Sequence, residues 1–395
     1  MSSLQDGIAV SREGRPGGSF ALLCLDRTTG ADLPAVRAGL SRLWSSCAGL
    51  QDGVLPNLSE PVDPEGLAVL VGFGPKLLVD TADGAPAELV ATRFPAPGGR
   101  GRPVLPGATL RWAGEVRRNP ADCDVVVQLT AASEAAVSRA LVEVCRSVRQ
   151  DGALCPTAVY PGFRRRDRRG WIGFHDGVSN PELSDRLDLL RVPDGSTPAW
   201  LRGGTYLAFL RVGVRLERWD AIEPAQQELV VGRHRETGAP LEVDPAAPDG
   251  YRPAHLPAPG DVFAAGNEEA RDPRPVCADE PSGLGQSHVH RARRHLTERI
   301  LRQGYDYLEP VAGPEVLRTG LNFVSFQSSP TRLARILTGP GWFGRSPFGG
   351  PDGEFTDLLE VYAAGMFALP PRAPAASAPA GCPGLDAIEP AVGAG

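Results

Sequence analysis

The sequence predicts an α+β fold built from sheets that carry helices on one face. Short apolar strand patterns recur along the chain, and two segments of the first half have apolar residues at helical spacing. The length of 395 residues suggests two domains and allows a sizeable core. Gly (47 residues) and Pro (39 residues) are abundant, so we expect many turns and long loops between the elements.

The first half shows the order strand, helix, strand, strand, helix. The strands are expected at 19–25, 67–73 and 124–129 and the helices at 33–47 and 133–148, with a long loop at 74–123 that contains a short strand or two. This order is typical of a ferredoxin-like α+β unit.

The second half follows the same broad logic without a repeated sequence. We expect loops at 150–170 and 236–282, strands at 205–219 and 321–327, helices at 291–301 and 330–338, and a closing apolar segment at 358–367. From Pro370 onward the sequence is rich in Pro and Ala and lacks either pattern, so it is predicted to be a disordered tail.

Charge and cysteine content restrict the partners and the compartment. The formal net charge of −6 gives no argument for nucleic acid or an anionic membrane as a partner. No run approaches the roughly 18 apolar residues of a membrane span. The seven cysteines are scattered and form no CxxC pair, which favours reduced thiols. The first residues show no leader pattern. We therefore expect a cytoplasmic protein.

The first candidate site is the stretch Trp171–Glu182. Gly173 and Gly177 enclose a short run that ends in Asp176. Glycines permit a tight turn and a close approach of the backbone to a bulky ligand. An aspartate in such a turn has the fixed position that a general base needs. The alternative is an Asp-Gly turn whose carboxylate is solvated.

The second candidate site holds three histidines, His288, His290 and His295. A neutral imidazole is a good axial ligand for haem iron. The three histidines are also compatible with a zinc site, although His288 and His290 would point apart on a helix. A third alternative is that none of them binds a ligand.

Four segments together resemble the dye-decolourising peroxidases, a family of haem enzymes. In chain order they are Gly173–Gly177 (the GxxDG signature, followed by Ser-Asn-Pro), Ser287–Val289 (the segment around the proximal ligand), Ile300–Tyr307 (Ile-Leu-Arg-x-Gly-x-x-Tyr) and Gly320–Phe323 (Gly-Leu-x-Phe). The resemblance runs from about Leu4 to Pro371, nearly the whole chain.

The resemblance implies two ferredoxin-like domains of the dimeric α+β barrel type, with antiparallel sheets and helices packed outside. The N-terminal domain would comprise residues 1–155 and the C-terminal, haem-binding domain residues 156–371, followed by a disordered tail at 372–395. It also implies one haem b per chain.

The resemblance further implies roles for the site residues. His288 would be the proximal ligand of the haem iron. Asp176 would be the general base and then the general acid, while Arg302 would stabilise developing negative charge. Leu321 and Phe323 would narrow the distal pocket. On the residues alone, Arg302 fits a solvated helix face equally well, and Leu321 and Phe323 fit plain core packing.

Two lesser sites follow from the same resemblance. Arg233, after Gly232, would bind a haem propionate, or else lie on the surface. One of two carboxylates, Asp357 or Glu360, would accept the proximal imidazole N–H, and Glu360 is the first choice.

The implied activity is a haem peroxidase that uses hydrogen peroxide to oxidise small aromatic donors, such as dyes and phenols, one electron at a time. Bulky donors would be oxidised at the surface through Trp171, Trp219, Tyr305 or Tyr307. The basic run Arg164–Arg169 is either a solvated face or a patch that receives an anionic group. A homo-oligomer is compatible with this reading. A specialised haem oxidase or oxygenase and a non-catalytic haem-binding protein stay open as alternatives.

Overall fold

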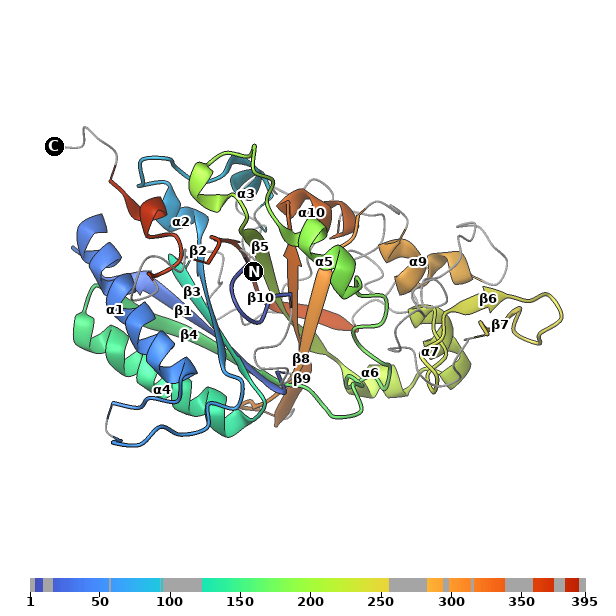
Figure 1. Cartoon of the computed structure of the whole chain (residues 1–395). Helices are drawn as coiled ribbons and strands as arrows, with labels where there is room; N and C mark the ends of the chain where they lie inside the picture. Colours follow the sequence, from blue (N-terminus) through green and yellow to red (C-terminus); the bar gives the residue numbers. More distant parts are fainter. Residues whose placement is uncertain are drawn as a thin grey trace.

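Long antiparallel strands from both halves of the chain close into one barrel in the computed structural model (Figure 1). The structure describes residues 4–9, 17–56, 58–92, 94, 123–255, 283–293, 298–313, 316–337, 358–372 and 381–390. Around the barrel the strands follow the order β1-β3-β2-β10-β5-β9-β8-β4.

The N-terminal half supplies neighbouring strands in the order β4-β1-β3-β2, and α1 and α4 pack against each other outside them (Figure 1). Its elements are β1 (Ser19–Arg27), α1 (Leu33–Gln51), β2 (Ala68–Phe73), α2 (Pro75–Leu78), α3 (Ala87–Ala91), β3 (Val125–Ala131), α4 (Glu134–Asp151) and β4 (Leu154–Phe163). The strands at 19–25, 67–73 and 124–129 and the helices at 33–47 and 133–148 are confirmed, but the described part of the loop expected at 74–123 contains the short helices α2 and α3 rather than short strands.

The C-terminal half supplies the other strands in the order β10-β5-β9-β8. Its elements are α5 (Leu183–Leu190), β5 (Thr205–Val214), α6 (Leu216–Asp220), α7 (Pro224–Val231), β6 (Leu241–Val243), β7 (Tyr251–Pro253), α9 (His288–Ala292), β8 (Leu301–Pro310), β9 (Leu317–Gln327), α10 (Pro330–Leu337) and β10 (Leu359–Leu369). Both halves place their fourth strand beside the first and their third beside the second. This β-α-β-β-α-β arrangement confirms two ferredoxin-like units.

The long helices of the first half begin at side-chain caps. The Asp32 carboxylate accepts the N–H of Ala35 at 2.8 Å where α1 begins, and the Ser133 hydroxyl accepts the N–H of Ala136 at 3.3 Å where α4 begins. Each helix then buries one apolar stripe against the sheet.

The strands β1, β2 and β3 are buried on both faces. In β1, Leu23 and Leu25 pack under the outer helices, while Phe20 and Leu22 fill the barrel interior. Successive side chains of a strand point to opposite faces, so one strand contributes to both cores.

Three elements predicted from residue 150 onward differ from the structure. The expected loop at 150–170 contains β4, which pairs with β1, and the boundary expected at residue 155 falls inside this strand. Pro156 and Pro161 weaken the strand pattern because proline lacks a donor for the sheet. The strand expected at 205–219 ends at Val214 and is followed by α6. Of the helix expected at 291–301, only the first two residues are helical in the described part of that range: α9 ends at Ala292, and β8 begins at Leu301.

The expected disorder from Pro370 onward is wrong for residues 381–390. A short 3-10 helix at Leu385–Ile388 packs against α1, and Cys382, Ala387 and Ile388 are buried there. The Pro- and Ala-rich composition of this segment did not reveal that a few of its apolar residues pack against α1, a helix far away in the sequence.

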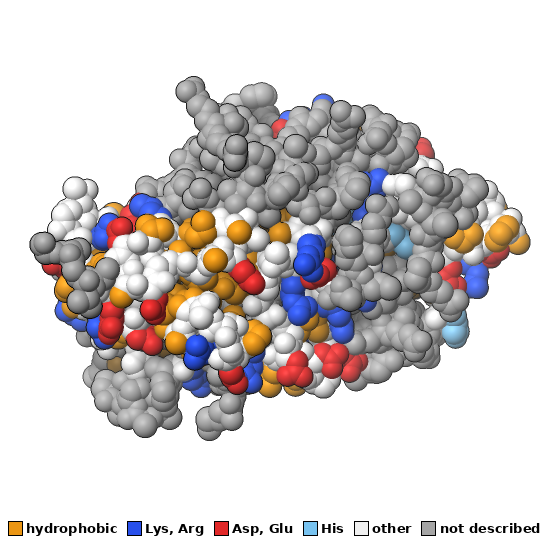
Figure 2. Space-filling view, turned by 90° about the horizontal axis from the view of Figure 1, so that it is seen from above, with side chains coloured by type: hydrophobic (Ala, Val, Ile, Leu, Met, Phe, Trp, Pro, Cys, Tyr) orange, Lys and Arg blue, Asp and Glu red, His pale blue; other side chains and the backbone are white. Residues whose placement is uncertain are grey.

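Basic and acidic side chains are interspersed over the face of the molecule shown in Figure 2. Within the described ranges, every helix is too short or too polar to cross a lipid bilayer.

Candidate active site

The structure brings Asp176, Arg233, His288, Arg302 and the pair Leu321 and Phe323 to one cavity of about 260 Å³. They come from five places in the chain: the loop after β4, the residue after the C-cap of α7, and the elements α9, β8 and β9. The rest of the cavity wall is largely apolar, with residues from β5, α10 and β10 among those that line it. The cavity therefore lies in the C-terminal half, between the sheet and the helices outside it.

The carboxyl group of Asp176 lies against β8, in the space left by the absence of a side chain at Gly304. A Cβ atom at Gly304 would overlap with Oδ2 of Asp176 and would approach Leu321 to 3.2 Å. The backbone N–H of Asp176 donates to the carbonyl of Arg168 at 2.9 Å. The predicted turn thus holds the half-buried carboxyl group against β8 in the cavity wall.

Asn180 ties the turn to β8 at Arg302. Its side-chain N–H donates to the carbonyl of Arg302 at 2.8 Å, and its Oδ1 accepts the backbone N–H of Arg302 at 3.0 Å. The guanidinium of Arg302 donates back to the carbonyl of Val178 at 2.5 Å. Asp176 and Arg302 are therefore held together by an exchange of hydrogen bonds. The sequence reasoning missed Asn180, although it lies in the Ser-Asn-Pro run beside the signature.

His288 begins the short helix α9 on the helix side of the cavity. Enclosure in the protein, and then the positive charges of Arg302 and Arg233, lower the pKa of His288 to about 4. At neutral pH the imidazole is therefore uncharged and keeps a lone pair for a metal ion.

Gly232 allows the His288 segment to pack close to the end of α7. It caps α7 with φ 84°, and a Cβ atom there would overlap with Ser287 Oγ. Val289 would be crowded in the same way, at 2.5 Å. The Gly-Arg segment thus has two roles. Gly232 leaves room for the segment that carries His288, and Arg233 lines the same cavity as His288.

Arg233 is 5% exposed and connects two loops. Its guanidinium donates to the carbonyl of Gly238 at 2.9 Å and to the hydroxyl of Ser179 at 2.8 Å. The buried guanidinium thus places a positive charge in the cavity wall, and a guanidinium is the kind of group that pairs with an anionic substituent.

Leu321 and Phe323 line the cavity from one face of β9, as the strand pattern predicted. The alternate residues Asn322 and Val324 are fully buried on the other face.

Glu360 does not serve the expected purpose. One of its oxygens pairs with Arg215, and the other accepts the Tyr362 hydroxyl at 3.0 Å. Leu359 lines the cavity from β10, so the neighbouring Glu360 points to the opposite face. Asp357 lies outside the described residues.

The described residues give no support to a zinc site. Nδ1 of His290 shares a hydrogen bond of 2.7 Å with the hydroxyl of Ser287, and His290 is buried. No group of three His, Cys, Asp or Glu side chains suited to a metal ion occurs in the part of the chain that the structure describes. His295 lies outside it.

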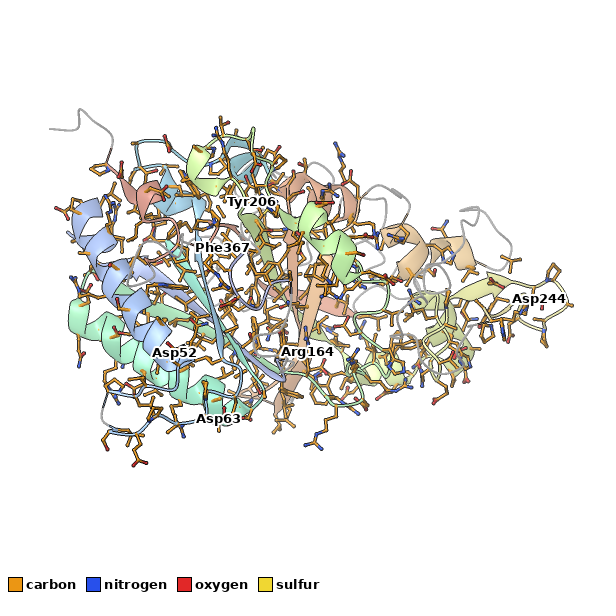
Figure 3. All side chains as sticks on the ribbon, in the orientation of Figure 1. Asp52, Asp63, Arg164, Tyr206, Asp244 and Phe367 are labelled. Atoms are coloured by element: carbon orange, nitrogen blue, oxygen red, sulfur yellow. The ribbon has the colours of Figure 1, made fainter. Side chains whose placement is uncertain are left out.

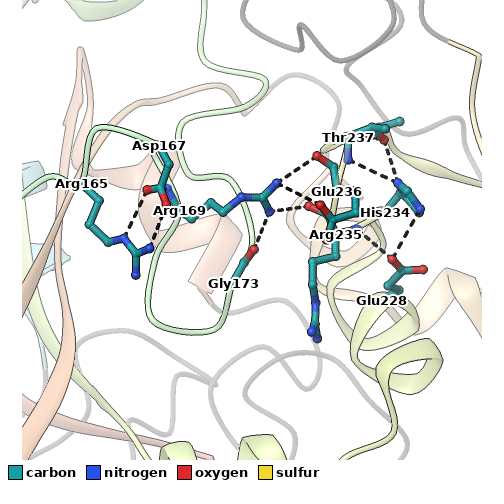
Figure 4. A network of polar contacts seen from close by, with 10 residues as sticks. Arg165, Asp167, Arg169, Gly173, Glu228, His234, Arg235, Glu236 and Thr237 are labelled. Atoms are coloured by element: carbon teal, nitrogen blue, oxygen red, sulfur yellow. Dashed lines mark hydrogen bonds and ion pairs between the residues drawn. The ribbon is translucent and has the colours of Figure 1, made fainter.

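The basic run after β4 is partly structural. Figure 4 shows Arg169 joining the Asp176 loop to residues 235–236: its guanidinium donates to the carbonyls of Gly173 at 2.7 Å and Arg235 at 2.6 Å. Arg164, labelled in Figure 3, donates from Nε to the carbonyl of Gly304 at 2.8 Å. Arg165 pairs with Asp167 in an exposed position. The prediction of a solvated face therefore holds for Arg165 but not for Arg169.

The residues present fit a haem group. An uncharged imidazole approaches from the helix side, a carboxyl and a guanidinium are held on the sheet side, and largely apolar walls lie between them. Axial histidine, a distal pocket with hydrogen-bonding groups and an apolar surround are the features by which proteins hold and tune haem iron.

Comparisons with known proteins agree with this geometry. The family model described as Dyp-type peroxidase, C-terminal, matches residues 167–373, just over half of the 395 residues. A dye-decolorizing peroxidase of Thermobifida fusca is 30% identical over 283 residues, which cover 68% of this chain and 57% of that protein. A deferrochelatase of Escherichia coli O157:H7 is 31% identical over 167 residues, which cover 40% of this chain and 34% of that protein. The matches thus span little more than half and about a third of these curated relatives.

A solved structure supports the same assignment. The crystal structure of a DyP-type peroxidase from Cellulomonas bogoriensis superposes with a TM-score of 0.65 at 25% identity, and the match covers 91% of both chains. From the matched family model and the shared fold, we conclude that the chain belongs to the dye-decolourising (Dyp-type) peroxidase family.

Proposed function

We propose that the protein is a haem b-dependent peroxidase that uses hydrogen peroxide to oxidise organic donors, including dyes and phenols, by one-electron steps. The proposal depends on one arrangement. The carboxyl group of Asp176 lies over Gly304, the loop that carries it is hydrogen-bonded to Arg302 through Asn180, and both residues line a cavity that His288 lines from the helix side. Haem binding alone needs neither the carboxyl nor the guanidinium, so their joint fixation favours catalysis.

Each residue has a separate task in this proposal. His288 would hold the haem from the α9 side, and Arg233 would bind a propionate. When bound, the haem would supply the redox-active iron. Asp176 accepts the proton of one peroxide oxygen and delivers it to the other, which then leaves as water. Arg302 stabilises the negative charge that develops meanwhile through its planar, positively charged guanidinium.

A second cavity gives peroxide a route to these residues. It has a volume of about 830 Å³ and shares Asp176, Arg302 and Gly304 with the first cavity. The carboxyl and the guanidinium thus stand in the wall between the two spaces. A small reactant can reach them from one side while the other side holds the cofactor.

Bulky donors need a surface site, and Trp171 is best placed for it. Its side chain lines the first cavity, is partly exposed, and lies 6.1 Å from the ring of Phe163. The other three candidates are buried: Trp219 and Tyr305 are 2% exposed and Tyr307 is 1% exposed. We propose Trp171 as the residue at which large donors lose an electron.

The test is peroxide-dependent oxidation of a phenol and of an anthraquinone dye by the haem-loaded protein. Asp176→Asn should slow the reaction with peroxide by about 10²–10⁴-fold, the usual contribution of a general base and acid, without loss of haem. Asp188→Asn removes an exposed carboxylate that lines neither cavity and should react like the parent. Equal rates in Asp176→Asn and the parent would contradict the proposal.

Release of iron from haem is a second candidate, because the name of the deferrochelatase relatives denotes removal of iron from a chelate. Fluorescence of iron-free porphyrin after incubation with haem and a reductant would distinguish it from peroxidase activity. A cytoplasmic location and assembly into a homo-oligomer stay predictions.

A further inference from the structure

Asp306 is a buried carboxyl group beside the half-buried Asp176, and the proposed chemistry does not use it. It lies on β8 on the same face as Arg302 and Gly304, because alternate residues of a strand share a face. Asp176 occupies the space above Gly304. The Asp176 carboxyl therefore lies between Arg302 on one side and Asp306 on the other.

The surroundings of Asp306 hold it in contact with the site. It is 6% exposed and lines both cavities, as Asp176 does. Its cross-strand neighbours are Phe163 on β4 and Leu321 on β9, which carry no charge. The backbone N–H of Trp171 donates to its carboxyl group.

The charged groups that face Asp306 come from β8 itself and from the loop after β4. Besides Arg302 on β8, they are Asp176, Arg165 and Asp167 of that loop. Burial, and then the negative charge of Asp176, raise the pKa of Asp306 to about 7. A carboxyl group whose pKa is raised by burial and by a neighbouring carboxylate is a common feature of sites that move protons.

Building on the proposed peroxidase function, we propose that Asp306 is a positioning residue that sets the negative charge around Asp176. When Asp306 is protonated and uncharged, Asp176 is the single carboxylate beside Arg302. Once ionised, Asp306 adds a second negative charge next to the place where peroxide gives up its proton. This charge opposes the negative charge that develops on the peroxide oxygens, so the reaction with peroxide slows as Asp306 ionises.

The first test follows the Asp306 proton itself and needs no turnover. Infrared difference spectra of the haem-loaded protein are recorded as the pH is raised. The parent should lose a carboxylic-acid band with a midpoint of about 7, and the band should be missing in Asp306→Asn. In Asp176→Asn the midpoint should fall, because the neighbouring negative charge is gone.

The second test is the rate of reaction with peroxide across the same pH range, measured by stopped flow. The parent rate should fall over the range in which the band is lost. Asp306→Asn should show no such fall and should react faster than the parent on the alkaline side. Asp188→Asn, at an exposed residue of α5 that lines neither cavity, should keep the fall at the parent midpoint. If Asp306→Asn does not fold, Asp306→Glu keeps a carboxyl in a changed position and should shift the midpoint of the rate profile and of the band together.

The outcomes separate this inference from the peroxidase proposal. A parent that fails to react with peroxide at any pH, while the band still titrates and still responds to Asp176→Asn, would contradict only the peroxidase proposal. A parent without a titrating band near neutral pH would overturn the inference about Asp306. So would an Asp306→Asn rate profile that keeps the fall of the parent.

Discussion

Gly304 leaves the space on β8 that the carboxyl group of Asp176 occupies. A residue without a side chain thus determines where the proposed base can lie. Asp306 and Arg302 flank the same space on the strand, so the charges next to Asp176 are fixed by β8 and not by the turn that carries it.

We predict that Gly304→Ala impairs the reaction with peroxide about 10²-fold or more, since the added methyl group displaces the general base. Haem uptake should be unchanged, because His288 lies on the other side of the cavity. Stopped-flow rates and the haem absorption spectrum measure the two effects. Gly195→Ala, at a glycine with nothing within 4 Å of the new Cβ atom, is the control and should behave like the parent. A Gly304→Ala variant that reacts with peroxide as fast as the parent would show that Asp176 does not depend on the space over Gly304.

At the scale of elements, the site depends on how α7 ends and α9 begins. Gly232 ends α7 in the left-handed conformation, and the segment Ser287–Val289 packs directly against it. The short helix α9 has little stability of its own, so this contact must help to fix the direction of His288.

We predict that Gly232→Ala weakens haem binding and lowers the free energy of unfolding. A left-handed non-glycine residue costs about 1–2 kcal/mol, and the clash with Ser287 adds to it. Gly152→Ala is the matched control, because Gly152 also caps a helix with φ 80° but has nothing near its Cβ atom. Both variants should unfold more easily in a thermal melt, and only Gly232→Ala should lose affinity in a haem titration. Equal haem affinity in the two variants would refute the packing role of Gly232.

The sequence predicted the elements whose pattern is local and missed those that depend on distant partners. The helices at 33–47 and 133–148 have complete apolar stripes and caps, and both are present. The strand β4 carries two prolines and is half exposed, so its pairing with β1 and β8 decides its structure. The proposed site residues were found because short motifs mark them. Asn180, Gly304 and Asp306 lie in or beside these motifs, but they act through contacts between distant parts of the chain, which a motif does not show.

At the scale of the whole molecule, the two ferredoxin-like units form one barrel. Residues 381–390 pack against the N-terminal unit. Seams at β2–β10 and β4–β8 close the barrel, and the second seam pairs Phe163 with Asp306. Residues 381–390 return to α1, where Ile388 is fully buried and Glu389 pairs with Arg37. The N-terminal unit thus gains part of its core from the last residues of the chain.

We predict that Ile388→Ala lowers the free energy of unfolding by about 2–5 kcal/mol, since a fully buried isoleucine is replaced by a cavity. The reaction of the folded variant with peroxide should stay at the parent rate, because Ile388 lines neither cavity. Denaturant unfolding measures the change. Val142→Ala, at a residue that is 55% exposed, should stay within about 0.5 kcal/mol of the parent. A similar stability of the two variants would mean that the tail contributes nothing to the core.

The most direct test of the central claim is the absorption spectrum of the haem-loaded protein, recorded before and after one equivalent of hydrogen peroxide, for the parent, His288→Ala and His255→Ala. His255 is exposed and serves as the control. We predict a haem band in the parent and in His255→Ala that changes on addition of peroxide, and a band that is lost or shifted in His288→Ala. A parent that takes up no haem, or a His288→Ala spectrum identical to that of the parent, would contradict the account.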